Sequence, residues 1–209
     1  MIAIVDYGVG NIFSVKRALN YIGEDGLLTG DPRDLEAADK IILPGVGAFG
    51  DAARKLEASG LRDVIIEQAG AGKPLLGICL GMQLLFTESL EYGVHAGLDL
   101  IPGRVVDMSG IIVDKTLKIP QIGWNGLDYP EGRREDSRHP LFKYTEEGEC
   151  VYFVHSFCAV DCDESVIATC EYSAPITAAV ARGNVMGTQF HPEKSGNTGM
   201  RILKAFCEI

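Results

Sequence analysis

The chain has 209 residues, 46% of them hydrophobic, and a formal net charge of −10 at pH 7. This length and composition predict one sizeable core in a single domain, residues 1–209. The negative charge disfavours nucleic acid as a main partner, and the chain lacks both a run of about 18 apolar residues and the basic start of a signal peptide. We therefore expect a cytoplasmic protein with no nucleic-acid or membrane partner.

The first half of the chain alternates short apolar runs with segments of helical periodicity. We expect strands at residues 2–5, 40–43 and 73–78, and helices at 12–22, 51–58, 61–69 and 80–86. This alternation predicts an α/β fold with a mainly parallel central sheet flanked by helices. The loops that follow parallel strands share one edge of the sheet, which is where sites form in such folds.

Two glycine-rich loops follow the first two of these strands. Residues 6–11 (DYGVGN) match only part of a dinucleotide fingerprint, because Phe13 stands where the third glycine should be. Residues 44–50 (PGVGAFG) fit the full spacing, but the nearest candidate for the required acidic residue, Glu67, lies in an expected helix. This second loop can instead turn backbone N–H groups toward a developing negative charge, or be a tight turn that needs glycine for steric reasons alone.

Cys79 lies at the turn between the third expected strand and the helix that follows. The surrounding sequence, GICLG at residues 77–81, has glycines two positions before and after the cysteine, which allow a sharp turn that presents the thiol. The start of a helix also favours thiolate over thiol. The pattern predicts a nucleophile, although a free cysteine is also commonly a small buried hydrophobic residue.

The second half of the chain has shorter expected strands without long helices between them. They lie at residues 101–106, 111–119, 126–129, 150–157, 165–172, 176–182 and 185–190, and a last helix is expected at 198–207. This pattern predicts a mixed or antiparallel extension of the sheet. Residues 131–140 (EGRREDSRHP) are expected to form a surface loop.

Four of the six cysteines cluster in the sequence around a histidine. Cys150, Cys158, Cys162, Cys170 and His155 suit zinc by residue type, but none of the spacings is the two-residue gap of structural zinc sites. We expect no metal and no cofactor, and we expect all six cysteines to stay reduced in the cytoplasm.

A histidine and a carboxylate follow the last expected strand. In an extended segment residues two apart project to the same side, so Glu193 can accept a hydrogen bond from His191 and fix its tautomer. Together with Cys79 they form a complete set of nucleophile, base and orienting group.

These residues resemble those of a known family. The elbow at residues 77–83 (GICLGMQ) and the distant residues 191–193 (HPE) resemble the class I glutamine amidotransferases, whose triad is cysteine, histidine and glutamate. Five ordered motifs look like those of the glutaminase subunits of imidazole glycerol phosphate synthase: residues 6–11, 44–49, 119–125 (IPQIGWN), 152–156 (YFVHS) and 191–195 (HPEKS). The resemblance runs from the first strand to the last helix and implies a flavodoxin-like α/β glutaminase domain.

The resemblance also implies the activity. It implies that L-glutamine is hydrolysed to glutamate and ammonia through a Cys79 thioester, with His191 as acid and base and Glu193 holding the imidazole. The implied oxyanion donors are backbone N–H groups of Val46, Gly47 and Leu80. The implied substrate contacts are Gln83, His155 and Ser156. On pattern alone Gln83 is equally a polar residue at a helix start, and a lone strand histidine such as His155 is more often structural than catalytic.

The ammonia implies a partner, because bulk water would protonate it and the sequence predicts no second catalytic domain. By resemblance the partner is the cyclase subunit of a heterodimer, which makes imidazole glycerol phosphate and AICAR in histidine biosynthesis. The interface candidates are Asn11, Pro120, Gly123, Trp124 and Lys194. Trp124, the only tryptophan, also suits a core position.

Three residues depart from those usual in the family: Gln121 replaces histidine, Phe157 replaces tyrosine and Gly196 replaces glutamine. Rival interpretations are a glutaminase of another synthase, such as those for anthranilate or guanylate, a γ-glutamyl hydrolase, a catalytically silent binding module and a nucleotide-binding regulator. The motifs at residues 44–49 and 120–125 argue against the other enzymes, and the intact triad argues against a silent module.

Overall fold

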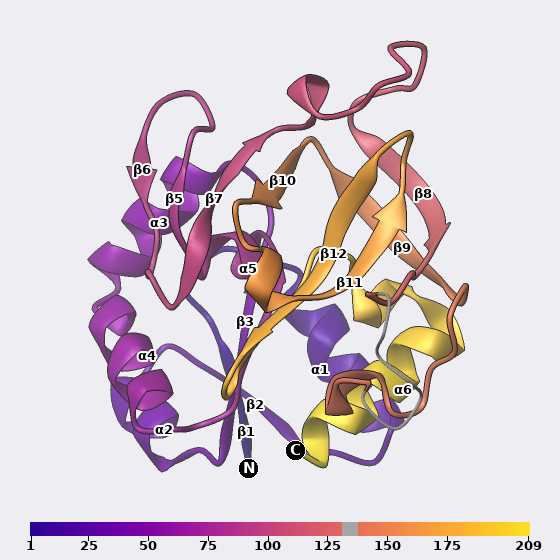
Figure 1. The fold of residues 1–209 in the computed structure, drawn as a ribbon. Helices are drawn as coiled ribbons and strands as arrows, with labels where there is room; N and C mark the ends of the chain where they lie inside the picture. Colours follow the sequence, from indigo (N-terminus) through magenta and orange to yellow (C-terminus); the bar gives the residue numbers. More distant parts are fainter. Residues whose placement is uncertain (131–137) are drawn as a thin grey trace.

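A computed structural model describes residues 1–130 and 138–209, in which the main element is a seven-stranded sheet (Figure 1). Its parallel part has the order β2 (Gly26–Thr29), β1 (Ile2–Val5), β3 (Lys40–Gly45), β4 (Leu75–Cys79) and β13 (Val185–Thr188). Beyond β13, β12 (Pro175–Arg182) and β11 (Val166–Glu171) continue the sheet in antiparallel fashion. The order of the parallel strands is that of flavodoxin-like folds, so the predicted fold class is confirmed.

Helices cover both faces of this sheet. On one face lie α1 (Ile12–Tyr21) and α6 (Gly196–Cys207), and on the other lie α2 (Pro32–Ala37), α3 (Phe49–Ala58) and α4 (Leu61–Gly70) (Figure 1). Successive strand residues point to opposite faces, so Ile4 and Ile42 pack with α1 and α6, whereas Val5 and Leu43 pack with α2 to α4. The central strands are therefore apolar on both faces, which explains their continuous hydrophobic runs.

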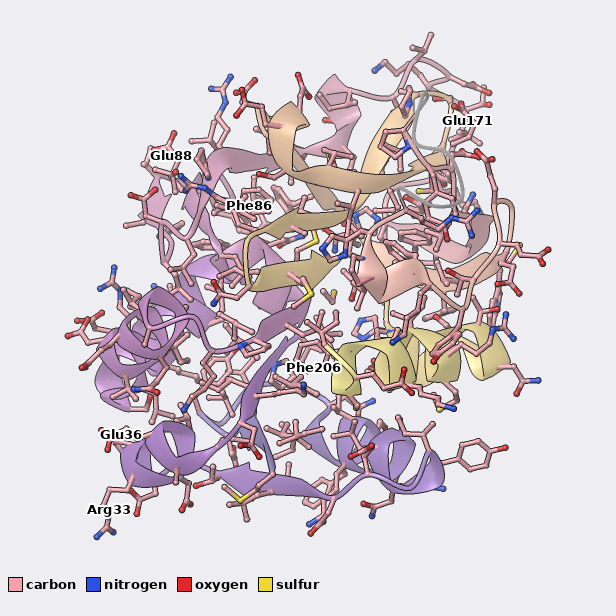
Figure 2. The ribbon with its side chains drawn as sticks, turned by 60° about the horizontal axis from the view of Figure 1, so that its bottom comes forward. Arg33, Glu36, Phe86, Glu88, Glu171 and Phe206 are labelled. Carbon is pink, nitrogen blue, oxygen red and sulfur yellow. The ribbon has the colours of Figure 1, made fainter. Side chains whose placement is uncertain are left out.

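The separation of apolar and charged side chains is visible in Figure 2, where Phe86 and Phe206 lie inside the molecule and Arg33, Glu36 and Glu171 lie at its periphery. Both phenylalanines are fully buried. Burial of each such side chain contributes roughly 1.5–3 kcal/mol to folding.

Strands between residues 86 and 160 form two smaller sheets in the described part of the molecule. One has the order β10 (Phe157–Val160), β7 (Ile101–Asp107), β5 (Phe86–Ser89) and β6 (His95–Ala96), with β5 and β7 parallel and the other pairs antiparallel. The other pairs β8 (Gln121–Gly126) with β9 (Cys150–His155) in antiparallel fashion. The antiparallel strands β11 and β12 confirm the predicted mixed or antiparallel extension of the central sheet, and these two small sheets are separate from it.

The strand predicted at residues 111–119 is wrong. A short 3₁₀ helix, η1 (Met108–Gly110), is followed there by turns. The Lys115 ammonium donates to the carbonyl oxygens of Ser109 and Ile112, and the Asp114 carboxylate accepts from the N–H of Thr116 at 2.9 Å. These local side-chain to backbone bonds replace a strand ladder.

Other predicted boundaries also need correction. The helix predicted at 80–86 is α5 (Leu80–Leu84), because Phe86 already begins β5. The strand predicted at 126–129 is reduced to an isolated bridge between Asp128 and Thr169, and the one at 150–157 divides at Ser156 into β9 and β10. The sequence patterns do not predict β2, α2, β5 or β6, and only the last residue of β8 falls within a predicted strand. Of the surface loop predicted at 131–140, residues 131–137 lie outside the described residues.

The elbow between β4 and α5 depends on glycines that allow close backbone contact. A Cβ atom on Gly81 would lie 1.8 Å from the carbonyl oxygen of Leu43, and one on Gly77 would lie 2.6 Å from that of Gly81. Between them Cys79 has φ 55° and ψ −111°, a conformation that non-glycine residues rarely adopt. The tight packing holds the backbone of Cys79 in this strained turn.

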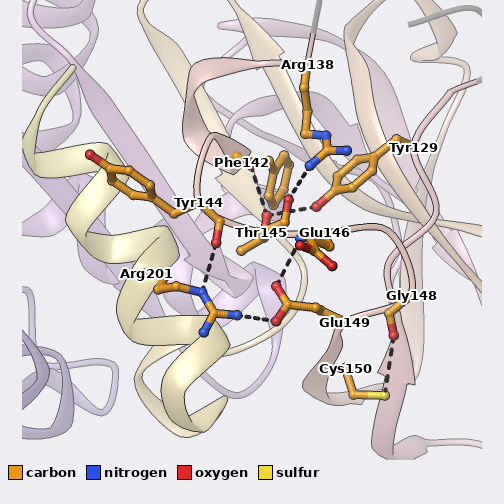
Figure 3. Close-up of polar contacts among 10 residues, drawn as sticks. All are labelled: Tyr129, Arg138, Phe142, Tyr144, Thr145, Glu146, Gly148, Glu149, Cys150 and Arg201. Atoms are coloured by element: carbon orange, nitrogen blue, oxygen red, sulfur yellow. Dashed lines mark hydrogen bonds and ion pairs between the residues drawn. The ribbon is translucent and has the colours of Figure 1, made fainter. Parts of the chain in front are cut away.

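A polar cluster fixes the segment that leads into β9 (Figure 3). Arg201 of α6 forms an ion pair with Glu149 and donates to the carbonyl oxygen of Tyr144 at 2.8 Å. Arg138 donates to the carbonyl oxygen of Thr145. These contacts attach the start of β9, whose far end carries candidate site residues, to α6.

We predict that Gly81→Ala destabilises the protein by more than about 3 kcal/mol, because overpacking a core typically costs about 1–3 kcal/mol and here the new methyl meets backbone. Gly70→Ala at the end of α4 is the matched control, since a Cβ there meets nothing within 4 Å and alanine favours a helix. Urea unfolding of both variants measures this difference. Equal stabilities would contradict the close-contact account of the elbow.

Candidate active site

The predicted triad residues meet at the carboxyl edge of the parallel strands. Strand β13 pairs in parallel with β4, with Thr188 opposite Ile78, so the chain leaves both strands at the same edge. His191 follows β13 and Cys79 ends β4, which brings together two residues more than 100 positions apart in the sequence.

His191 and Glu193 form a buried pair. Nδ1 of His191 lies 2.8 Å from Oε1 of Glu193, and their side chains are 3% and 1% exposed. The extended geometry assumed from the sequence is wrong, because β13 ends at Thr188 and residues Pro192–Lys194 form a 3₁₀ helix, η5. The predicted contact nevertheless exists, within this turn.

Backbone bonds hold the His191 ring in place. The His191 N–H donates to the carbonyl oxygen of Tyr152 at 3.0 Å, which attaches it to β9. The Ser195 hydroxyl donates to the His191 carbonyl oxygen at 2.6 Å and accepts from the N–H of Tyr152 at 2.9 Å. Ser195 therefore links both sides of the turn.

The surroundings of His191 favour its protonated form. Burial alone lowers its pKa, but hydrogen bonds with Cys79 and Glu193 and the negative charges of both outweigh burial and raise the pKa to about 9. Nδ1 of His191 faces Glu193, so Nε2 is the ring nitrogen that remains to exchange a proton with Cys79. The second carboxylate oxygen of Glu193, Oε2, is buried without a partner in the described structure.

A cavity of about 440 Å³ opens over the thiol. Its walls include these predicted residues: Val46, Gly47, Cys79, Leu80, Gln83, His155, Ser156 and His191. Of the interface candidates, Pro120 and Lys194 also line it. Glu193 is absent from the lining because it lies behind His191, and Asn11, Gly123 and Trp124 lie outside the lining as well.

The residues predicted as oxyanion donors line the same cavity as the thiol. Gly45 is in register with Cys79, so the turn after β3 begins beside the sulfur, and Gly47 has φ 91°, which favours glycine. The buried Tyr7 hydroxyl donates to the carbonyl oxygen of Pro44 at 2.9 Å. Burial and the nearby charge of Cys79 raise the pKa of Tyr7, so it stays protonated and fastens this strand end.

Gln83 and His155 share one acceptor, the carbonyl oxygen of Phe157. Gln83 Nε2 donates to it at 3.1 Å and to Oε1 of Gln189 at 3.0 Å, which leaves Oε1 of Gln83 as its acceptor. His155 Nδ1 lies 2.8 Å from the same carbonyl and must carry the hydrogen, because a carbonyl only accepts. Burial lowers the pKa of His155 to about 4, so the ring is neutral, and its buried Nε2 has no partner among the described residues.

Several residues at the site have no predicted role from the sequence, among them Glu91, Tyr92, Val154 and Gln189. Glu91 and Tyr92 line the cavity, and Glu91 accepts from the N–H of Phe49 at the start of α3 at 2.5 Å. No spacing in the sequence relates Glu91 to the elbow. Gln189 donates to the Cys79 sulfur at 3.8 Å, and its position two residues before His191 was a usable signal.

The interface candidates include an exposed aromatic side chain. Trp124 is 55% exposed and packs edge-on against Tyr152 with ring centroids 6.0 Å apart, so the alternative that Trp124 is a core residue is wrong.

Two of the residues that differ from those usual in the family have a clear structural setting. Gly196 has φ 56°, which favours glycine. Gln121 is fully buried and donates to Asn125 at 2.9 Å.

The zinc alternative gains no support. Within residues 1–130 and 138–209, no three His, Cys, Asp or Glu side chains are grouped so that they would hold a metal ion. In the same residues, we find no helix with the length and hydrophobicity needed to cross a membrane.

Known proteins are similar to this chain in sequence. Residues 3–209 match the family described as "Glutamine amidotransferase class-I". The chain is 48% identical to imidazole glycerol phosphate synthase subunit HisH of Syntrophotalea carbinolica, with 100% of both chains covered, and 48% identical to that of Methanosarcina acetivorans, covering 100% of this chain and 98% of the relative.

Solved structures share the fold at lower identity. A structure described as a glutamine amidotransferase has a TM-score of 0.74 at 20% identity, covering 100% of this chain and 98% of that one. PurLQS from Thermotoga maritima has a TM-score of 0.70 at 21% identity, covering 99% and 97%.

We predict that His191 titrates near pH 9, above its ordinary value of 6.5. The folded chain binds this proton more tightly than the unfolded chain, so its stabilising effect is complete below about pH 6.5 and is lost as the pH rises through about 9. Nuclear magnetic resonance of ring-labelled histidines measures the midpoint. In Cys79→Ala the midpoint should fall, and a wild-type midpoint at or below 6.5 would contradict the geometry.

Proposed function

The chain belongs to the class-I glutamine amidotransferases, in the family of imidazole glycerol phosphate synthase subunit HisH, and we propose that the cavity over Cys79 is its glutaminase site. The protein hydrolyses L-glutamine and supplies ammonia for histidine biosynthesis. The observation that carries the site assignment is the convergence of Cys79 and His191 on one cavity, with Glu193 behind the imidazole.

In the first half-reaction, the Cys79 thiolate attacks the side-chain amide carbon of glutamine, and the π electron pair of the carbonyl moves to oxygen. When this oxyanion collapses, the C–N bond breaks and His191 gives its Nε2 proton to the departing nitrogen. Ammonia leaves, and a glutamyl thioester remains on Cys79. His191 is then neutral, with its tautomer fixed by Glu193.

In the second half-reaction, neutral His191 takes a proton from water, and the resulting hydroxide attacks the thioester carbon. Collapse of the second oxyanion breaks the C–S bond, and the electron pair returns to sulfur as thiolate. Glutamate leaves, its acid proton passes to solvent, and His191 is again protonated. The high pKa of His191 suits this resting state.

Both oxyanions need donors, and we assign them to Leu80 and the turn at Val46 and Gly47. Leu80 begins α5 directly after the nucleophile, and the turn starts beside Cys79 because Gly45 is paired with it. Tyr7 holds this strand end through Pro44. Each such donor typically contributes about 10²–10³ in rate.

Polar groups of the cavity wall suit the rest of the glutamine molecule. Glu91 offers a carboxylate for the α-ammonium group, and Gln83 offers the amide oxygen left free by its two donated bonds. His155 and Ser156 complete this polar side of the cavity. The α-ammonium and side-chain amide groups of glutamine carry the N–H donors that the Glu91 carboxylate and the Gln83 amide oxygen can accept.

The ammonia requires a partner with direct access to the cavity, and we propose that the cyclase subunit docks at its rim in a heterodimer. Pro120 and Lys194 line the cavity, and Trp124 lies exposed on β8, the strand that follows Pro120. Gly123, beside Trp124, has φ 146°, and Asn11 accepts from the Ser14 hydroxyl at 2.9 Å at the start of α1. The products of the assembled synthase would be imidazole glycerol phosphate and AICAR.

The whole chain is assigned to one domain and to one cellular compartment. We assign residues 1–209 to one glutaminase domain, because its hydrophobic clusters combine residues of both halves, such as Ile42 with Phe153. We place the protein in the cytoplasm, because a reactive Cys79 among five other free cysteines needs a reducing compartment.

We predict that Cys79→Ala abolishes glutamate release from glutamine, because it removes the nucleophile. Glu193→Gln should lower kcat by about 10²-fold or more, because the neutral amide no longer stabilises the imidazolium. Cys150→Ala, which removes an exposed cysteine outside the cavity, is the matched control and should keep the wild-type rate. A Cys79→Ala protein with wild-type turnover would end this assignment.

We also predict that Trp124→Ala weakens binding of a cyclase subunit by about ten-fold or more, because a central tryptophan in an interface typically contributes more than about 1.4 kcal/mol. Tyr21→Ala is the control, since Tyr21 is 76% exposed at the far end of α1. Isothermal titration calorimetry measures both affinities. Equal affinities for the two variants would remove Trp124 from the interface.

A further inference from the structure

A chain of buried amides connects the backbone at Phe157 to the sulfur of Cys79. Gln83 Nε2 lies 3.1 Å from the Phe157 carbonyl oxygen and 3.0 Å from Gln189 Oε1. Gln189 Nε2 lies 3.8 Å from Sγ of Cys79. Gln189 is fully buried and does not line the cavity, so solvent does not compete for its amide.

The Phe157 carbonyl fixes the direction of every hydrogen bond in this series of amides. The Phe157 carbonyl can only accept, so the Gln83 atom that faces it must be the NH₂ nitrogen. That nitrogen also faces Gln189, which must therefore present its oxygen. Only the NH₂ group of Gln189 then remains for Cys79, and it can only donate.

We propose that Gln189 is a catalytic residue that donates a hydrogen bond to the Cys79 sulfur and stabilises its thiolate. The His191 ring lines the same cavity and interacts with Cys79, so it is a second candidate donor to the sulfur. A sulfur that accepts from two donors is best satisfied when it carries the negative charge itself. The role of Gln189 in turnover rests on the proposed glutaminase function, whereas its effect on the thiol does not.

The bond matters most when sulfur is the leaving group. In the second half-reaction the C–S bond breaks and the electron pair moves to Sγ, while His191 has just taken a proton from water. Gln189 is neutral and cannot transfer a proton, but its N–H already faces the atom on which the charge develops. Loss of this donor should therefore slow hydrolysis of the thioester more than it weakens glutamine binding.

The direct test is the pH dependence of Cys79 alkylation by iodoacetamide, followed on the Cys79 peptide by mass spectrometry. In Gln189→Met, which keeps the size of the side chain without a donor, the midpoint should rise by about one pH unit. Gln189→Leu also removes the donor, so its midpoint should rise as far. It serves if the methionine variant does not fold.

Gln121→Met is the matched control. Gln121 is also fully buried and its amide donates to a cysteine sulfur, that of Cys170 at 3.6 Å. Its replacement removes a contact of the same kind and should leave the Cys79 midpoint at the wild-type value. Steady-state kinetics of Gln189→Met should show a fall of about ten-fold in kcat and a parallel fall in KM, because slower hydrolysis of the thioester makes the covalent intermediate accumulate and leaves kcat/KM nearly unchanged.

A midpoint for the Gln189 variants equal to that of the wild type would overturn the proposal and leave Gln189 a packing residue. That result would not affect the glutaminase assignment if wild-type Cys79 still reacts faster than Cys150. If wild-type Cys79 reacts no faster than this exposed cysteine, the proposed function itself fails. The experiment thus separates the two failures.

Discussion

The parallel pairing of β4 with both β3 and β13 is the constraint on which the candidate site depends. It places the end of β4 between two other strand ends, so that Cys79 lies beside the turn after β3 and beside the segment that carries His191. The three segments come from distant parts of the sequence, and only the register of the sheet brings them together. Apolar burial on both faces of the central strands holds them in the middle of the sheet.

Buried polar groups with only one possible hydrogen-bonding state organise the chemistry around the sulfur. The Phe157 carbonyl fixes the tautomer of His155 and the orientation of Gln83, and through Gln83 that of Gln189. Glu193 similarly fixes His191. Because these groups are removed from water, their partners need not reorganise during the reaction, which is the condition for electrostatic stabilisation of a transition state.

The sequence predicted the parts of the site that have a local signal. The elbow around Cys79 needs glycine at two fixed positions, and His191 and Glu193 are two residues apart, so these groups could be found without a structure. Glu91 has no such signal, because its relation to the cavity arises from the packing of the loop after β5 against α3. The strand predicted at 111–119 is wrong for a different, local reason. Its apolar residues suggest a strand, but the side chains of Asp114 and Lys115 form hydrogen bonds with nearby backbone groups.

The most direct test of the thioester mechanism is to quench the wild-type protein rapidly during turnover of glutamine and to analyse its peptides by mass spectrometry. This mechanism predicts a glutamyl adduct on the peptide that contains Cys79, formed before glutamate is released and lost when glutamine is exhausted. Release of glutamate at the normal rate with no adduct on Cys79, or with an adduct on another residue, would contradict a thioester mechanism at this site.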